Sequence, residues 1–150
     1  LLCEVRNTYV NHEVAMGRQL EIAPDAEMVV FVSDKTLVRR VIGNMVKNAL
    51  EACKPGQTVT ISCHARADGP EFSVHNPSAM PRDVQLQVFQ RSFSTKGVGR
   101  GLGTYGMKLL SERFLQGQVS FTTSAGEGTT FFARYPSILV AAPDDSGGME

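Results

Sequence analysis

Apolar residues recur along the chain with two spacings, which predict where helices and strands form. A spacing of about 3.6 residues predicts helices at 1–16, 34–53 and 104–115. Short or alternating apolar runs predict strands at 19–23, 28–32, 59–65, 71–75, 119–123 and 129–135. Ser33 or Asp34 can cap the long central helix, and Pro55-Gly56 ends it. This order of elements predicts a two-layer α/β sandwich.

Two segments lack either spacing. The connection 76–103 is long for a compact domain, which is typical of a lid or binding loop. We expect Phe89 and Phe93, one helical turn apart, to anchor its middle against the body. Beyond Pro136 the chain is rich in Ala, Pro, Asp and Gly, so we expect a domain at 1–136 and a flexible acidic tail at 137–150.

Composition narrows the class of protein. Fifteen basic and fifteen acidic residues cancel, which argues against a general binder of nucleic acid or anionic membranes. No apolar run approaches the roughly 20 residues of a membrane-spanning helix. Cys3, Cys53 and Cys63 form no CxxC pair, so a reducing cytoplasm is expected. Because the chain begins at Leu1 without Met, we expect it to be a fragment of a longer protein.

The central helix carries an unusual polar stripe. Asn44, Asn48 and Glu51 stand at i, i+4 and i+7 and therefore share one side of the helix. Asn is a mediocre helix former, and its side-chain carbonyl is a ligand that Mg²⁺ accepts. The stripe predicts either a metal-binding face or a polar boundary hydrogen-bonded to neighbouring backbone.

A second signal is the glycine run at 97–103, which leads directly into the helix predicted from Thr104. Glycine amides at a helix start can approach phosphate oxygens closely. Around the run, Asp83 is outnumbered by basic residues: Arg82, Arg91, Lys96, Arg100 and Lys108. This excess suits a polyphosphate, although an exposed basic face would have the same composition.

Four motifs in order then resemble those of a known family. The N-box resemblance lies in residues 44–52, NMVKNALEA, and the F-box resemblance in 89–96, FQRSFSTK. Residues 99–107, GRGLGTYGM, resemble the G2 box, and residues 126–129, GEGT, resemble the last glycine box. Together they cover about 34–135 and resemble the ATP-binding catalytic domain of sensor histidine kinases in the GHKL ATPase superfamily.

The resemblance implies a Bergerat-type α+β fold, with a mixed, mostly antiparallel sheet covered by three helices. It implies an enzyme that transfers the γ-phosphoryl group of ATP to a histidine, with ATP and Mg²⁺ bound. Its expected partners are the dimerisation and phosphoacceptor domain of the same kinase and a downstream response regulator. It would lie in the cytoplasmic portion of the sensor, without contacting nucleic acid or membrane itself.

The family match also assigns residues. Asn48 would ligate Mg²⁺ with Asn44 assisting, and Lys96 would act with both in catalysis. The expected ATP-binding residues are Asn44, Lys47, Asn48, Glu51, Asn76, Met80, Phe93, Lys96, Arg100, Gly101, Leu102, Gly103, Thr104, Tyr105, Gly106 and Thr129.

The G1 box departs from the family pattern, D-x-G-x-G, whose Asp receives the adenine amino group. Here the stretch at 74–81 contains neither Asp nor Gly, and the F box has Arg91 and Ser92 where Pro and Phe are common. If Phe72 and Val74 face the core, strand parity favours Asn76 as the substitute. An alignment without a gap favours His75 instead.

Hydrolysing members of the superfamily carry a Glu where this chain has Asn44, so ATP hydrolysis should be poor. His12, His64 and His75 lack the context of a phosphoacceptor, which we expect on a separate domain. A non-catalytic nucleotide-sensing module is the alternative that the altered G1 box favours. A hydrolysing GHKL ATPase is a further alternative.

Overall fold

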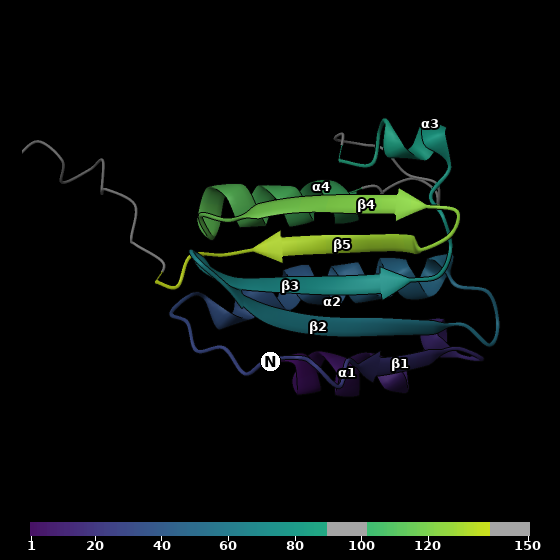
Figure 1. Ribbon diagram of the computed structural model, residues 1–150, viewed down its shortest axis with the longest axis horizontal. Helices are drawn as coiled ribbons and strands as arrows, with labels where there is room; N and C mark the ends of the chain where they lie inside the picture. Colours follow the sequence, from purple (N-terminus) through teal and green to yellow (C-terminus); the bar gives the residue numbers. More distant parts are fainter. Residues whose placement is uncertain (90–101, 139–150) are drawn as a thin grey trace, which may run out of the picture.

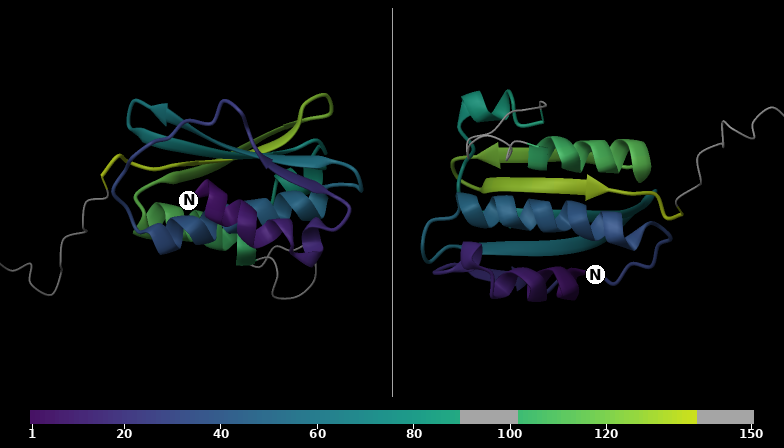
Figure 2. Two further views of the ribbon diagram at one scale, coloured as in Figure 1. Left: turned by 90° about the horizontal axis from the view of Figure 1, so that it is seen from below. Right: turned by 180° about the vertical axis from the view of Figure 1, so that it is seen from behind.

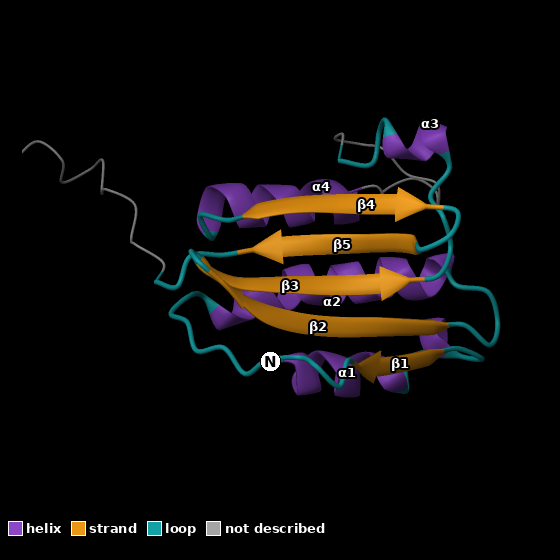
Figure 3. Cartoon of the chain, in the orientation of Figure 1, coloured by secondary structure: helices purple, strands orange, loops and turns teal. Residues whose placement is uncertain are grey.

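The computed structural model describes residues 1–89 and 102–138, and these residues form two layers (Figures 1 and 3). One layer is a five-stranded sheet with the strand order β1-β2-β3-β5-β4. Its strands are β1 (Gln19–Ile22), β2 (Thr58–Arg66), β3 (Gly69–Asn76), β4 (Gln118–Ser124) and β5 (Gly128–Arg134). β1 and β2 are parallel and the other neighbours antiparallel, which confirms the mixed, mostly antiparallel sheet.

The second layer consists of helices on one face of the sheet (Figure 2). It contains α1 (Leu2–Val10), α2 (Lys35–Ala52) and α4 (Leu102–Leu109), with the short turns η1 (Glu13–Ala15) and η2 (Leu110–Phe114) following α1 and α4. A single-turn helix, α3 (Arg82–Gln85), lies beside the end of β4. The expected α+β fold is confirmed. None of the described helices is long and apolar enough to span a bilayer.

The sequence of α2 explains its start and its buried face. The Asp34 carboxylate accepts a hydrogen bond of 3.0 Å from the Leu37 amide, which caps the helix. Residues at the helical spacing are buried against the sheet: Val38, Val41, Ile42, Met45, Val46, Ala49 and Leu50. The helix is therefore fixed to the sheet by one face, and the polar stripe lies beside that face.

Phe89 joins the long connection to the sheet. Its ring centroid lies 5.9 Å from that of Phe121 on β4 and 6.1 Å from that of Phe131 on β5. The predicted anchoring by Phe89 is confirmed, whereas Phe93 lies outside the described residues. Part of the connection is helical, because α3 occupies Arg82–Gln85.

The predicted strand at 28–32 is wrong. Residues 23–27 already occupy the outer edge of β2. The Ala23 amide donates to the Ile61 carbonyl, and the Glu27 amide donates to the Cys63 carbonyl. Within the described ranges 1–89 and 102–138, no strand pairs with the following residues, and Val32 makes an isolated bridge to Ile138. The apolar alternation persists, since Val29 packs on the core while the side chain of Met28 is 96% exposed.

Two predicted helices differ in their bounds. The first ends at Val10 instead of residue 16, because His12 takes an extended conformation and its side chain caps η1. The third begins at Leu102 and passes into the π-helical turn η2 after Leu109. Of the predicted tail, the structure describes only residues 137 and 138.

Candidate functional site

The polar stripe of α2 leads to one end of the sheet. Its members Asn44, Asn48 and Glu51 are all half-buried, and so is Lys47. The last turns of α2, the end of β3, the start of β5 and the start of α4 lie at this same end (Figures 1 and 2). A hydrogen bond of 3.3 Å from the Ser78 hydroxyl to the Gln57 side-chain oxygen links the segment after β3 to the segment after α2. The fold therefore brings the last turns of α2, which carry part of the N-box motif, to the same end of the sheet as the start of α4 and the end of β3.

At the end of β3, side chains alternate between the two faces of the sheet as the sequence predicts. Asn76 is only 3% exposed and shares the helix-covered face with Phe72 and Val74, which are buried too. His75 points to the other face, where its Nε2 donates a hydrogen bond of 2.6 Å to the Glu127 carbonyl. Of the two alternatives for the missing G1 Asp, Asn76 thus lies on the side of α2.

Asn76 belongs to a connected set of polar groups. Its side-chain amide donates to the Ser78 carbonyl at 3.4 Å, and the Thr129 hydroxyl donates to the same carbonyl at 2.7 Å. The Thr129 and Thr123 hydroxyls lie 2.8 Å apart, and the Met80 amide donates to Thr123 at 2.8 Å. Asn76, Thr129 and Thr123 are direct cross-strand partners on β3, β5 and β4, which explains their contact.

Gly128 permits this arrangement. Its φ of +83° is one that side-chain-bearing residues rarely adopt, and a Cβ atom there would lie 2.2 Å from the Asn76 carbonyl oxygen. The turn between β4 and β5 can therefore approach the backbone of Asn76 and Pro77 only because this residue is glycine. The glycine box is thus a steric requirement of the end of β3.

Sequence reasoning missed Thr123 and Ser78. Thr123 could have been found, because it follows Val119 and Phe121 with the period of two of a strand and therefore shares their inward face. Ser78 acts through its backbone carbonyl, for which the sequence carries no signal. Ser78 stands in the altered G1 stretch at 74–81, whereas Thr123 stands in none of the motifs.

The other predicted site residues are only partly visible. Phe93, Lys96, Arg100 and Gly101 lie outside the described residues. Leu102, Gly103 and Tyr105 are placed in α4 by their backbone, and Thr104 and Gly106 are half-buried there. Met80 is partly buried and packs against the hydrophobic core. The start of α4 therefore contributes backbone to the same end of the sheet.

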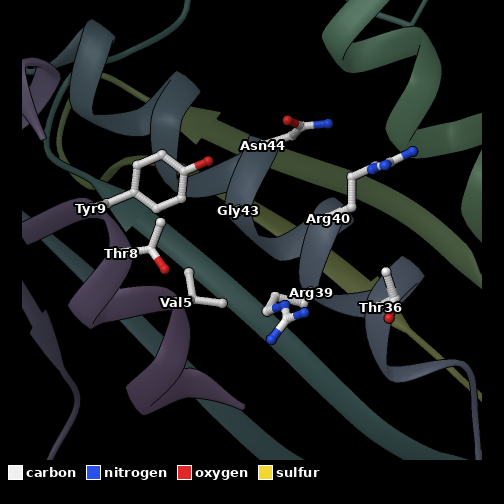
Figure 4. A pocket seen from close by; sticks show the side chains of 8 residues that line it. All are labelled: Val5, Thr8, Tyr9, Thr36, Arg39, Arg40, Gly43 and Asn44. Carbon is white, nitrogen blue, oxygen red and sulfur yellow. The ribbon is translucent and has the colours of Figure 1, made fainter.

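A cleft of about 280 Å³ lies between α1 and the first half of α2 (Figure 4). Its lining residues are Val5, Thr8, Tyr9, Thr36, Arg39, Arg40, Gly43 and Asn44. The Tyr9 ring covers Gly43, where a Cβ atom would be 3.3 Å away, and burial raises the pKa of the Tyr9 hydroxyl. Asn44 lines this cleft as well as belonging to the polar stripe.

Comparison with known proteins agrees with the geometry. Residues 33–138 match the family described as histidine kinase-, DNA gyrase B-, and HSP90-like ATPase. The chain is 29% identical over 111 residues to the sensor protein DegM of Bacillus sp. (strain B21-2), a match that covers 73% of the chain. It spans only 30% of the length of that relative.

Solved structures of two histidine kinases have the same fold. The catalytic domain of ThkA has a TM-score of 0.78 at 24% identity, over 91% of this chain and 90% of that one. ThkA in its complex with the response regulator TrrA has a TM-score of 0.73 at 20% identity, over 91% of this chain and 39% of that one. Full-length ShkA in complex with AMPPNP has a TM-score of 0.77 at 23% identity, over 95% of this chain and 30% of that one. The chain belongs to the histidine kinase-, DNA gyrase B-, and HSP90-like ATPase family.

Proposed function

We propose that this domain binds ATP with Mg²⁺ and transfers the γ-phosphoryl group to a histidine on the dimerisation domain of the same kinase. A response regulator would then receive the phosphoryl group. The observation that carries the proposal is the meeting of the α2 stripe, the Asn76–Thr129 pair and the start of α4 at one end of the sheet. The AMPPNP complex of ShkA and the TrrA complex of ThkA support it by analogy.

The polar stripe of α2 suits a magnesium ion. Asn44, Asn48 and Glu51 offer amide and carboxylate oxygens, the hard ligands that Mg²⁺ prefers. The described residues contain no cluster of three His, Cys, Asp or Glu side chains that could hold a metal, so the ion would depend on these oxygens and on the phosphates. Bound Mg²⁺ would neutralise phosphate charge, the main requirement of phosphoryl transfer.

Each predicted residue then has a defined task. Asn48 would ligate the ion with Asn44 assisting, while Lys47 and Glu51 would border the phosphates on α2. Lys96, Phe93, Arg100 and the backbone of 101–106 would hold and cover the phosphates, with Lys96 close to the transferred group. Asn76, Met80, Leu102 and Thr129 would bind the adenine.

A separate acceptor is supported by the contacts of all three histidines. His12 Nδ1 accepts the Val14 amide at 3.1 Å, and His75 Nε2 is bonded to Glu127. His64 lies 3.1 Å from both Ser62 Oγ and Glu27 Oε1. Each imidazole is thus engaged within the fold, and Asn44 cannot act as a base for water. Transfer to an external histidine is therefore favoured over hydrolysis.

The test is a reconstituted transfer assay. The domain, mixed with or rejoined to its own dimerisation domain, should form acid-labile phosphohistidine there from ATP and Mg²⁺. Asn48→Ala should abolish labelling while the thermal unfolding midpoint stays close to the wild type. Asn7→Ala, the same exchange at an exposed position of α1, is the matched control and should retain activity.

A nucleotide-sensing module is the second candidate, because the stretch 74–81 lacks the Asp and the two glycines of the family's G1 box. Failure of the wild-type pair to label, despite measured ATP binding, would leave that function in place of the kinase. Rapid ATP hydrolysis by the domain alone would instead favour the hydrolysing ATPase.

A further inference from the structure

The hydrogen bonds at the end of β3, β5 and β4 have directions that the structure determines. The Ser78 carbonyl can only accept, so the single hydroxyl proton of Thr129 is donated to it. Because the Thr129 proton is used in this way, Thr129 must accept from Thr123, and Thr123 accepts from the Met80 amide. The bonds form one relay that starts at the Met80 amide and ends at the Ser78 carbonyl.

This relay determines how the Asn76 amide is turned. The end of the side chain nearest the Ser78 carbonyl must be the NH₂ group, because the reverse orientation would set two acceptors 3.4 Å apart. The hydrogen bond from the Thr129 hydroxyl fixes the position of that carbonyl, and the hydrogen bond from the Thr123 hydroxyl fixes the position of Thr129. The Asn76 oxygen is therefore kept on the side away from Ser78, where it is available as an acceptor.

We propose that Thr123 is a positioning residue which, through Thr129 and Ser78, orients Asn76 to select nucleotides with a 6-amino purine over those with a 6-oxo purine. The proposal rests on the proposed nucleotide site. A carboxylate accepts at both oxygens whichever way it turns, whereas an amide presents an acceptor or a donor according to its orientation. An Asn at this position thus needs a fixed orientation, and the relay supplies it.

Thr123 lies outside every motif that predicts the site, and its hydroxyl donates its one proton to Thr129 and accepts from the Met80 amide within the protein. In the proposal it acts on the nucleotide through Asn76. A purine with an amino group at position 6 would donate to the Asn76 oxygen, while an oxo group there would face a second acceptor. Loss of the relay would let the amide turn over and offer its NH₂ group to the oxo group.

The experiment measures dissociation constants for ADP and GDP by calorimetry on the chain and its variants. Thr123→Val removes the hydroxyl at nearly constant volume, and Thr123→Ser keeps it. Thr122→Val is the matched control, since Thr122 is exposed and points to the opposite face of β4. The wild type should prefer ADP, and Thr123→Val should reduce the ratio of the two constants by about two- to tenfold, the value of one hydrogen bond.

Thr123→Ser and Thr122→Val should keep the wild-type ratio. A purely structural role of Thr123 would weaken ADP and GDP alike and leave the ratio unchanged, which would overturn the proposal. If Thr123→Val does not fold, Thr123→Cys makes the same test with a weak donor. If the wild type binds neither nucleotide, the proposed function fails with it. If it binds ADP and no hydroxyl loss alters the ratio, only the role of Thr123 fails.

Discussion

β3 and β5 hold buried polar groups at both of their ends, and the two ends satisfy them differently. At one end, Glu71 is only 4% exposed, on the sheet face opposite the helices, and is bonded to Arg66 at 3.0 Å and to Arg134. At the other end, Asn76 and Thr129 are equally buried on the helix-covered face and are joined by neutral hydrogen bonds.

The two ends differ in the charge of their polar groups and in whether the hydrogen bonds within the protein use every acceptor oxygen. Burial alone would raise the pKa of Glu71, but the hydrogen bonds and charges of Arg134 and Arg66 lower it below its ordinary value. Both carboxylate oxygens thus have cationic partners. At the Asn76 end the relay uses the hydroxyl protons and leaves an amide oxygen for a ligand. Buried polarity therefore stabilises the fold at one end and, in the proposed function, would take part in nucleotide binding at the other.

The largest expected effect comes from removing the glycine that brings the turn to Asn76. Gly128→Ala should lower the free energy of unfolding by at least about 2 kcal/mol, because its φ is positive and the added Cβ would meet the Asn76 carbonyl. Gly126→Ala in the same turn is the control, since a Cβ atom there meets nothing within 4 Å. It should change stability by less than about 0.5 kcal/mol. Urea unfolding measures both, and equal stabilities would refute the steric role.

At the opposite end, Glu71→Gln should cost about 1–3 kcal/mol, because it weakens two charge-assisted hydrogen bonds. Nucleotide affinity should not change. Since the pKa of Glu71 is lower in the folded state than the ordinary 4.5, its contribution is present above about pH 4.5 and is lost as the pH falls through the folded value.

Wild-type stability should therefore fall more steeply in acid than that of Glu71→Gln, in urea unfolding series at decreasing pH. Glu21→Gln, at an exposed position of β1, should behave like the wild type. Parallel pH profiles of the wild type and Glu71→Gln would contradict the structural role of the carboxylate.

A carboxylate introduced at position 76 should strengthen binding and weaken stability, whereas the Glu71 carboxylate stabilises the fold. Asn76→Asp should tighten ADP binding by about two- to tenfold, because a charged acceptor makes the stronger bond with an amino group. It should also destabilise the free protein by about 1–2 kcal/mol, since the new carboxylate meets the Ser78 carbonyl instead of arginines. Calorimetry and thermal unfolding measure the two effects. Asn11→Asp, at an exposed position after α1, is the control, and unchanged or weaker binding in Asn76→Asp would count against the site.

The fold could be predicted from the sequence where periodicity and burial agree. The apolar positions of α2 and the inward parity of Phe72, Val74 and Asn76 follow directly from spacings of 3.6 and 2. The prediction of a strand at 28–32 failed because the alternation of apolar residues does not reveal that the edge of β2 is already occupied. Pairing depends on what the rest of the chain occupies, which a local pattern does not contain.

The candidate site could be predicted where its residues stand in the family motifs. Asn44, Asn48 and Thr129 stand in motifs whose order marks the family, and α2 and β5 carry them to the same end of the sheet. The relay through Ser78 and Thr123 could not be predicted, because it depends on a backbone carbonyl and on cross-strand register. The bond from the Thr129 hydroxyl to the Ser78 carbonyl, for example, joins residues 51 positions apart through the fold alone.

The smallest expected effect decides between the two alignments of the altered box. His75→Ala should leave the affinity for ADP within about twofold of the wild type, because the imidazole lies on the face of the sheet away from α2. Loss of its hydrogen bond to the Glu127 carbonyl should cost about 0.5–1 kcal/mol of stability. Asn76→Ala is the matched comparison, one residue along the same strand, and it should weaken ADP binding. If His75→Ala abolished binding while Asn76→Ala retained it, the ungapped alignment would be correct, and the buried end of β3 would be structural like the end that holds Glu71.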